Sequence, residues 1–158
     1  MTSEGDIGAF LGVDIQHNSD GFLALVQTGL INKIISVCGL EDESNQHKTP
    51  STTSLYDDDS GPDREQTWNY RSVIGMLTYL STSTRPDIAF AVHQCVRFCT
   101  KPKRSHELAI RHTVCYLKGT KHRGYILKPS STHRNLDCFV DTCLMVLQAA
   151  DRNSAQYY

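Results

Sequence analysis

Apolar and polar residues alternate in two short stretches near the start of the chain. Every second position of residues 11–15 is apolar, and residues 22–26 form a second apolar run after the turn sequence of residues 18–21. Alternation with a period of two, interrupted by a turn, predicts a β-hairpin. Apolar positions then follow a helical period over a wide arc of residues 28–38 and stop at Gly39. This pattern predicts a helix that is largely buried.

Three further helices are predicted in the middle of the chain. The first covers roughly residues 64–82, where apolar side chains recur every three or four positions. The second opens with Pro86, which suits a first helical turn because no hydrogen bond is needed from its nitrogen. The third covers residues 105–118, with Ser105 as its N-cap and Gly119 as its stop.

The segments around these helices complete an α+β fold that is mostly helical. Residues 40–66 contain Pro, Gly and a run of aspartates without periodicity, which predicts a flexible acidic linker. Two short strands are predicted at residues 124–127 and 136–140. The expected organisation is a hairpin and helix (1–39), the linker (40–66), a helical body (67–123), the terminal strands (124–141) and an unassigned tail (142–158).

Composition narrows the class of protein. The hydrophobic content of 39% is ordinary for a globular chain, and no run of 18 apolar residues or signal-peptide pattern is present. We therefore expect no membrane contact. The six cysteines show no framework spacing, which favours reduced thiols and an intracellular location, cytoplasmic or nuclear.

The net charge of −1 conceals a segregation of charge along the chain. Residues 1–63 hold eleven acidic side chains and two lysines, whereas residues 64–135 hold thirteen Lys and Arg and three acidic side chains. Arg104, Arg111 and Lys118 recur every seventh residue and line up on one side of a predicted helix. Such a stripe can follow a phosphate backbone. A solvated helix surface has the same pattern, so charge alone favours nucleic-acid binding and a solvated surface equally.

Two motifs suggest catalysis or metal binding but fit structural roles better. Tyr56-Asp57-Asp58-Asp59 matches the Tyr-x-Asp-Asp pattern of polymerase metal sites, yet no apolar strands flank it, so an acidic linker is favoured. Cys95 and Cys99 lie four residues apart on an apolar helical stripe. Core packing is favoured for them because no four-ligand spacing is present.

Several strings occur together in the order and spacing of one known family. They are Phe10-Leu-Gly-Val-Asp-Ile, Thr49-Pro50, Tyr70-Arg-Ser-Val-Ile-Gly-Met-Leu-Thr-Tyr-Leu80, Thr84-Arg-Pro-Asp-Ile-Ala-Phe-Ala-Val92 and Tyr116-Leu-Lys-Gly-Thr120. Over roughly residues 8–141 the chain resembles the pol polyprotein of copia-type LTR retrotransposons. The matching segment follows the catalytic hairpin of the reverse transcriptase and runs through the thumb and connection toward ribonuclease H.

The resemblance implies a role for each part. Residues 1–39 would form the edge of the palm, and residues 67–123 would be thumb and connection helices that hold an RNA/DNA template–primer duplex. Residues 124–141 would be the first strands of a truncated ribonuclease H-like domain, with Asp141 at the family's first metal-binding aspartate. The side chains expected to contact nucleic acid are Arg71, Arg85, Arg104, Arg111, Lys118, Lys121 and Arg123.

The departures from the family pattern bear on activity. The catalytic aspartates of the polymerase would lie before Met1, and Cys143 stands where the family has a second ribonuclease H aspartate. We therefore expect no complete catalytic site and no cofactor bound by this chain alone, although Mg²⁺ is implied for the parent enzyme. The rest of the pol polyprotein is an implied partner. A stand-alone nucleic-acid-binding module, or an interaction domain that docks on an acidic partner, remains the alternative.

Overall fold

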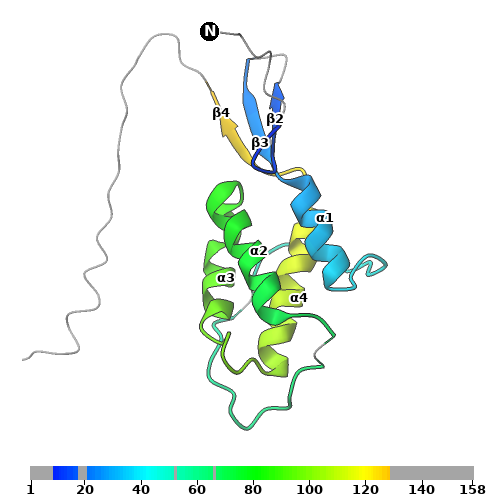
Figure 1. Ribbon diagram of the computed structural model, residues 1–158, viewed down its shortest axis with the longest axis vertical. Coiled ribbons are helices and arrows are strands. Elements are labelled where there is room, and N and C mark those ends of the chain that lie inside the picture. The colour runs from blue at the N-terminus through cyan, green and yellow to red at the C-terminus, as the bar shows by residue number, and fades with distance from the viewer. Residues whose placement is uncertain (1–8, 18–20, 52, 66, 129–158) are drawn as a thin grey trace, which may run out of the picture.

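The computed structural model describes residues 9–17, 21–51, 53–65 and 67–128. A small β-sheet lies at one end and a body of helices at the other, and α1 leads from the first to the second (Figure 1). In chain order the elements are β1 (Ala9–Phe10), β2 (Val13–His17), β3 (Leu23–Val26), α1 (Thr28–Val37), α2 (Tyr70–Ser83), the 3₁₀ helix η1 (Pro86–Ile88), α3 (Ala89–Val96), α4 (Arg104–Gly119) and β4 (Tyr125–Leu127). This arrangement confirms the predicted α+β class.

The sheet is antiparallel with the strand order β1-β2-β3-β4. The alternating stretch that predicted one strand is broken at Leu11 and Gly12, whose φ angles are 50° and 75°. Two consecutive residues with positive φ form the tight turn that matches the twist of a two-residue hairpin. Phe10 therefore pairs with Val13, and β1 becomes an additional edge strand. Periodicity alone could not show this turn, because Leu11 is an unusual residue at positive φ.

The strand predicted at residues 124–127 exists as β4, but it joins the N-terminal sheet. Leu25 of β3 pairs with Tyr125 of β4. A Cβ added at Gly124 would lie 2.0 Å from the carbonyl oxygen of Leu25, so only glycine permits this close approach. The structure pairs this strand with the hairpin's sheet, and the assignment of residues 124–141 to a truncated ribonuclease H-like domain stays a prediction. The strand predicted at 136–140, Asp141 and the tail lie outside the described residues.

The helical body encloses one hydrophobic core, formed where α1, α2, α3 and α4 meet. Ile31, Leu77, Ile88 and Ile110 are each fully or almost fully buried in it. Cys95 also lies in this core, as the apolar stripe predicted. Burial raises the pKa of the Cys95 thiol to about 12. Among the described residues, no group of three or more His, Cys, Asp or Glu side chains is arranged to hold a metal ion.

Two helix boundaries differ from the prediction. The helix expected from residue 64 begins at Tyr70, where the Asn69 side chain accepts a hydrogen bond of 3.0 Å from the backbone N–H of Ser72. The helix expected to start after Ser105 begins two residues earlier, at Arg104, with Lys103 as its N-cap. The ring Nδ1 of His106 accepts a 3.0 Å hydrogen bond from the Lys103 backbone N–H and secures this end. No helix in the described ranges combines the length and apolarity that a membrane span needs.

Candidate nucleic-acid interface

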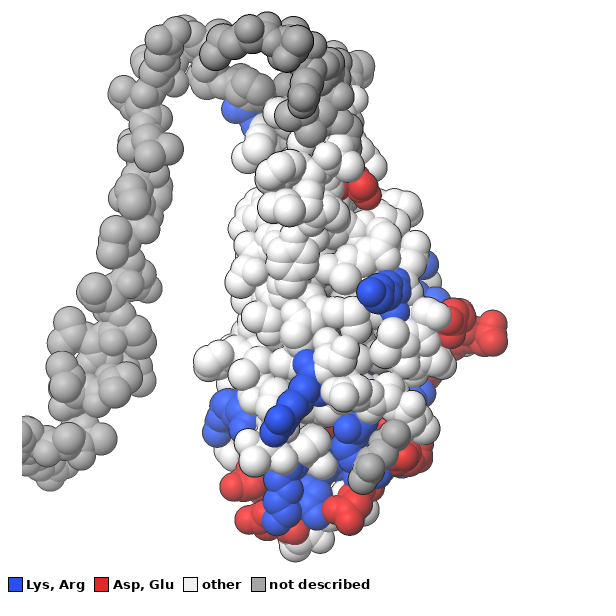
Figure 2. Space-filling view, viewed as in Figure 1, with Lys and Arg blue, Asp and Glu red and all other residues white. Residues whose placement is uncertain are grey.

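The acidic and basic blocks of the sequence meet along α4. In the structure, five ion pairs join the segment between α1 and α2 to the region around α4. They are Arg104–Glu65, Arg111–Glu43 (3.4 Å), Lys103–Asp63 (2.7 Å), Lys101–Asp59 (3.0 Å) and Arg64–Glu107 (3.5 Å). Figure 2 shows Lys and Arg gathered beside Asp and Glu around the helical end, while the sheet end of this face carries few charges. The chain's own acidic segment therefore neutralises much of its basic block.

Lys118 completes this pairing without a carboxylate. Its Nζ donates hydrogen bonds to the backbone carbonyls of Leu40, Glu41 and Glu43 at 2.8, 2.5 and 2.7 Å. An ammonium group has three N–H donors, and all three are satisfied by these carbonyls. Lys118 is therefore a clamp that fixes the chain after α1 against the end of α4, and it would have to release these contacts to bind a phosphate.

The segment of residues 40–66, expected as a flexible linker, follows α4 closely where it is described. The ring Nε2 of His112 lies 3.0 Å from the carbonyl oxygen of Thr49, and the Thr113 hydroxyl donates to the carbonyl of Pro50 at 3.0 Å. His47 stacks on His112 with 3.8 Å between ring centroids. No helix or multi-residue strand is assigned in the described part of this segment, as predicted, but its path is fixed by side chains of α4.

The Tyr56-Asp57-Asp58-Asp59 motif lies within this acidic segment and not between strands. The Asp58 carboxylate accepts a 2.7 Å hydrogen bond from the Ser105 hydroxyl, and Asp59 pairs with Lys101. The hydrogen bond and charge of Lys101 hold the pKa of Asp59 below its ordinary value. These aspartates act as partners of basic and hydroxyl groups, and the set does not fit a Mg²⁺ site, which needs carboxylates free to converge on the ion.

Arg85, one of the predicted nucleic-acid ligands, is 1% exposed and fully used within the fold. It forms two hydrogen bonds to the Asp87 carboxylate at 2.9 and 2.8 Å, and it donates to the carbonyl and hydroxyl oxygens of Thr120 at 2.8 and 2.7 Å. Asp87 also accepts a 2.6 Å hydrogen bond from the Tyr116 hydroxyl. The prediction for Arg85 is therefore corrected: it joins the end of α2 to the end of α4 and cannot reach a ligand.

The remaining predicted ligands keep cationic groups at the surface. Arg71 on α2, and Lys121 and Arg123 after α4, form no ion pair within the part of the chain that the structure describes. Arg71 and Arg123 are exposed, and Lys121 is half-buried. The seven predicted residues thus form three groups: Arg85 is buried, Arg104, Arg111 and Lys118 face the acidic segment, and Arg71, Lys121 and Arg123 lie at the surface.

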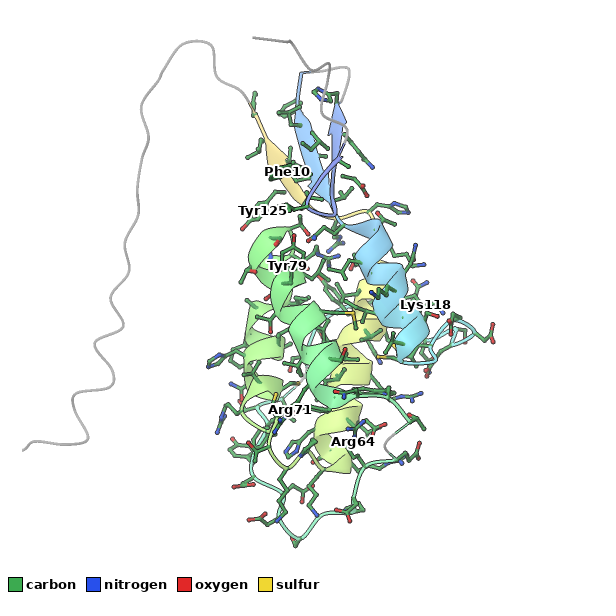
Figure 3. All side chains as sticks on the ribbon, in the orientation of Figure 1. Phe10, Arg64, Arg71, Tyr79, Lys118 and Tyr125 are labelled. Carbon is green, nitrogen blue, oxygen red and sulfur yellow. The ribbon has the colours of Figure 1, made fainter. Side chains whose placement is uncertain are left out.

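A pocket that sequence reasoning missed lies beside Arg71. It has a volume of about 540 Å³, and its lining includes Arg64, Trp68, Asn69 and Arg71. Figure 3 labels Arg64 and Arg71 toward the lower end of the helical body. The Arg64 guanidinium lies 4.9 Å from the centroid of the Trp68 ring. Arg64 falls outside the seven-residue stripe, so periodicity gave it no weight. The single tryptophan of the chain, just before α2, was the available signal.

A second surface is apolar and joins the sheet to α2. Phe10 and Leu11 are 64% and 74% exposed, and they line a cavity of about 370 Å³ with Tyr79 of α2. The Tyr79 hydroxyl donates a 2.6 Å hydrogen bond to the carbonyl of Leu11. Phe10 and Tyr79 lie at the junction of the two parts of the fold in Figure 3. The end of the molecule that carries few charges thus exposes apolar side chains.

The Pol polyproteins of retrotransposons are among the proteins to which this chain is similar in sequence. The chain is 32% identical to an uncharacterized mitochondrial protein of Arabidopsis thaliana over 143 residues. This aligned region covers 90% of the chain and 58% of that protein. It is 38% identical over 79 residues to the retrovirus-related Pol polyprotein from transposon RE1 of Arabidopsis thaliana, or 50% of this chain and 5% of the polyprotein. It is 31% identical over 126 residues to the putative transposon Ty5-1 protein YCL074W of Saccharomyces cerevisiae, or 77% of this chain and 39% of that protein.

These relatives support the resemblance seen in the sequence: the chain is similar to parts of retrotransposon Pol polyproteins. It spans between about one twentieth and three fifths of the length of these three relatives. No family model matches the chain, and no solved structure matches it.

Proposed function

We propose that this chain is the segment of a retrotransposon reverse transcriptase that helps to hold the template–primer duplex, and that it has no catalytic site of its own. The observation that carries this proposal is that three of the predicted ligands, Arg71, Lys121 and Arg123, lie at the surface outside the ion pairs of the described residues. Contacts of this kind neutralise phosphates and release counterions without reading base sequence. A polymerase needs this property, because it must bind every sequence that it copies.

The ion pairs along α4 limit how this binding can occur. Arg104 and Arg111 already face Glu65 and Glu43, and the Lys118 ammonium is enclosed by carbonyls. A phosphate at α4 must compete with these internal partners, whereas one at Arg71, Lys121 or Arg123 meets no such competitor among the described residues. Duplex contacts are therefore assigned first to the unpaired cations.

Polymerase chemistry is assigned to other parts of the parent polyprotein. Two-metal phosphoryl transfer needs several carboxylates that converge on Mg²⁺. The described aspartates around residue 58 are instead paired with Ser105 and Lys101. Apolar side chains at the sheet end, with Phe10 and Leu11 the most exposed in that cavity, suit burial against the rest of the polyprotein.

An acidic protein partner is a weaker candidate, because the acidic side chains that would match α4 are supplied by the chain itself.

The experiment that tests the proposal measures binding of a fluorescein-labelled RNA/DNA hybrid to the full chain by anisotropy at several salt concentrations. We expect affinity to fall steeply with salt, and the double variant Lys121→Gln/Arg123→Gln to lower the slope of log K against log [salt] by about one to two. Lys33→Gln, on α1, is the control, because it also replaces a cationic side chain by glutamine.

Binding that is undetectable or independent of salt would refute the proposal. Equal loss in the Lys33→Gln control would show a general effect of net charge and would also contradict it. If heparin or hybrid duplex fails to compete with an acidic protein for the chain, the interaction-domain alternative takes its place.

A further inference from the structure

The pocket beside the start of α2 has the composition of an anion site. Its lining is two arginines, three neutral polar side chains, two aromatic rings, one cysteine and one proline, and it holds no acidic side chain. The lining residues are Arg64, Thr67, Trp68, Asn69, Tyr70, Arg71, Cys99, Thr100 and Pro102. Its volume of about 540 Å³ leaves room for a phosphate group together with the sugar that carries it.

Arg71 supplies the available charge. Its Nε donates a 3.1 Å hydrogen bond to the carbonyl of Cys99, which fixes the side chain at the mouth between α2 and the end of α3. Its terminal nitrogens have no hydrogen-bond partner among the described residues, so a planar pair of N–H donors remains available. Two parallel donors of this type match the oxygens of a phosphate.

Arg64 forms the wall of the pocket and is fixed more firmly. Its guanidinium lies over the rings of Trp68 and Tyr70, at 4.9 and 5.6 Å from their centroids, and donates to the carbonyl of Trp68. Glu107, which does not line the pocket, lies 3.5 Å from the Arg64 Nε and balances part of its charge. Arg64 therefore positions the aromatic wall, and Arg71 is the cation that stays without a carboxylate.

Trp68 provides an independent sign of an absent partner. It is 7% exposed, and its indole N–H has no hydrogen-bond partner within the described part of the chain. A buried polar group without a partner costs free energy, so the indole N–H would gain from an acceptor atom that came within its reach. The first turn of α2 adds the positive end of a 14-residue helix that carries no acidic side chain there.

We propose that this pocket, formed by Arg71, Arg64, Trp68 and the first turn of α2, binds a phosphate group of a nucleic-acid strand. The proposal deepens the proposed function and rests on it for the identity of the ligand, since the pocket chemistry itself specifies a phosphate. The phosphate of the strand lies against the two terminal nitrogens of Arg71, and Trp68 contributes a buried wall of the pocket.

The only tryptophan of the chain stands in the pocket and gives a specific signal. The full chain, labelled with ¹⁵N, is titrated with inorganic phosphate, with chloride at matched ionic strength, and with a short RNA/DNA hybrid. The indole N–H resonance of Trp68 reports the pocket, and anisotropy of the labelled hybrid reports overall binding. We expect a saturable shift of this resonance with phosphate and with the hybrid, and none with chloride.

Arg71→Gln is the test variant and Arg97→Gln the matched control, because Arg97 is exposed, follows α3 and does not line the pocket. Hydrogen bonds to charged groups are strong enough that the loss of Arg71 is expected to weaken phosphate binding about tenfold or more. Arg97→Gln should leave it unchanged. Arg71→Lys, which keeps the charge but loses the fork, should fall between the two.

The outcomes separate the pocket from the proposed function. A Trp68 resonance unmoved by phosphate and by hybrid, or equal losses in the Arg71 and Arg97 variants, overturns the phosphate site. Tight hybrid binding that ignores Arg71→Gln overturns the site while the duplex-binding function stands. A phosphate-dependent shift that requires Arg71, in a chain that does not bind hybrid, supports the site and refutes the function.

Discussion

Replacement of Arg85 by alanine tests whether the Thr84-Arg-Pro-Asp motif is structural. Arg85 is 1% exposed, and four hydrogen bonds join it to Asp87 and Thr120. Its guanidinium also lies 5.6 Å from the centroid of the Tyr116 ring. The substitution removes a link between the end of α2, η1 and the end of α4.

The size of the effect follows from what each group loses. Removing one member of a buried ion pair costs about 3–5 kcal/mol. The Asp87 side chain is 37% exposed and retains its hydrogen bond from Tyr116, so water can solvate the remaining carboxylate. We therefore expect the lower value, about 3 kcal/mol, which lowers the melting temperature by roughly 6–12 °C in a chain of this size.

The partner variant gives a sharper test, because the two side chains differ in burial. Asp87→Asn leaves the charge of Arg85 buried without a counter-charge, so it should destabilise the chain at least as much as Arg85→Ala. The double variant should cost clearly less than the sum of the two single variants, since the second substitution removes a group already unpaired.

Acid unfolding provides a second readout of the same network. Partial burial raises the pKa of Asp87, but hydrogen bonds from Arg85 and Tyr116 outweigh this effect and hold the pKa below its ordinary value. A carboxyl group with a lowered pKa in the folded state stabilises the fold above its unfolded pKa, and this contribution is lost as pH falls through the folded pKa. Arg85→Ala should therefore flatten the acid part of the stability curve.

The assay is thermal unfolding followed by circular dichroism, with Arg97→Ala as the control. Arg97 is exposed, and among the described residues it contacts only its neighbours Gln94, by a hydrogen bond, and Phe98, whose ring centroid is 5.3 Å from the guanidinium, so its loss should change stability by less than about 0.5 kcal/mol. A melting temperature for Arg85→Ala within about 2 °C of the parent chain, or additive effects of the Arg85 and Asp87 variants, would refute the structural role.

Three further outcomes are expected. The melting temperature should fall as pH is lowered below about 4, because hydrogen bonds from Lys103 and Arg104 hold the pKa values of their carboxyl partners below the ordinary range; a melting temperature that does not change in acid would contradict this pairing. Gly124→Ala should destabilise the sheet, since a Cβ there would lie 2.0 Å from a backbone carbonyl oxygen. Gly75→Ala in α2, where a Cβ meets open space, should instead stabilise the chain by about 0.5–1 kcal/mol in urea unfolding. Similar effects of the two substitutions would argue against the β3–β4 contact. A short pulse of iodoacetamide followed by peptide mass spectrometry should modify Cys99 faster than the core thiols, whose pKa values are raised by burial, and equal rates would contradict the core placement.

Local patterns in the sequence were sufficient to predict most of the regular elements. The helical period around α1, α2 and α4 depends on side chains three or four residues apart, and the structure places most of those apolar positions in the core, although Val37 of α1 is exposed. Pro86 correctly marked the start of a helical turn. The alternating stretch around β2 was also recognised, although the turn at Leu11 depends on an unusual backbone conformation that no apolar pattern reports.

The candidate site was predicted less well, because its chemistry depends on contacts between distant segments. The seven-residue stripe of Arg104, Arg111 and Lys118 is real on the helix, but the sequence cannot show that Glu65 and Glu43 lie opposite two of its members. Arg85 could not be distinguished from a surface arginine, since its burial is created by residues of α4 that lie more than thirty positions away. Arg64 was missed because it lies outside this stripe.

The pairing of β3 with β4 has a consequence for how the chain folds. Leu25 and Tyr125 become neighbours only after about one hundred residues between them have been compacted. Closing so long a loop of unstructured chain is entropically unfavourable, and its cost grows with the logarithm of loop length. The intervening helices shorten the span before the strands meet, so the helical body should form first and β4 should dock last. In hydrogen exchange, amides of the β3–β4 ladder should then exchange through partial opening while those of α2 and α4 remain protected.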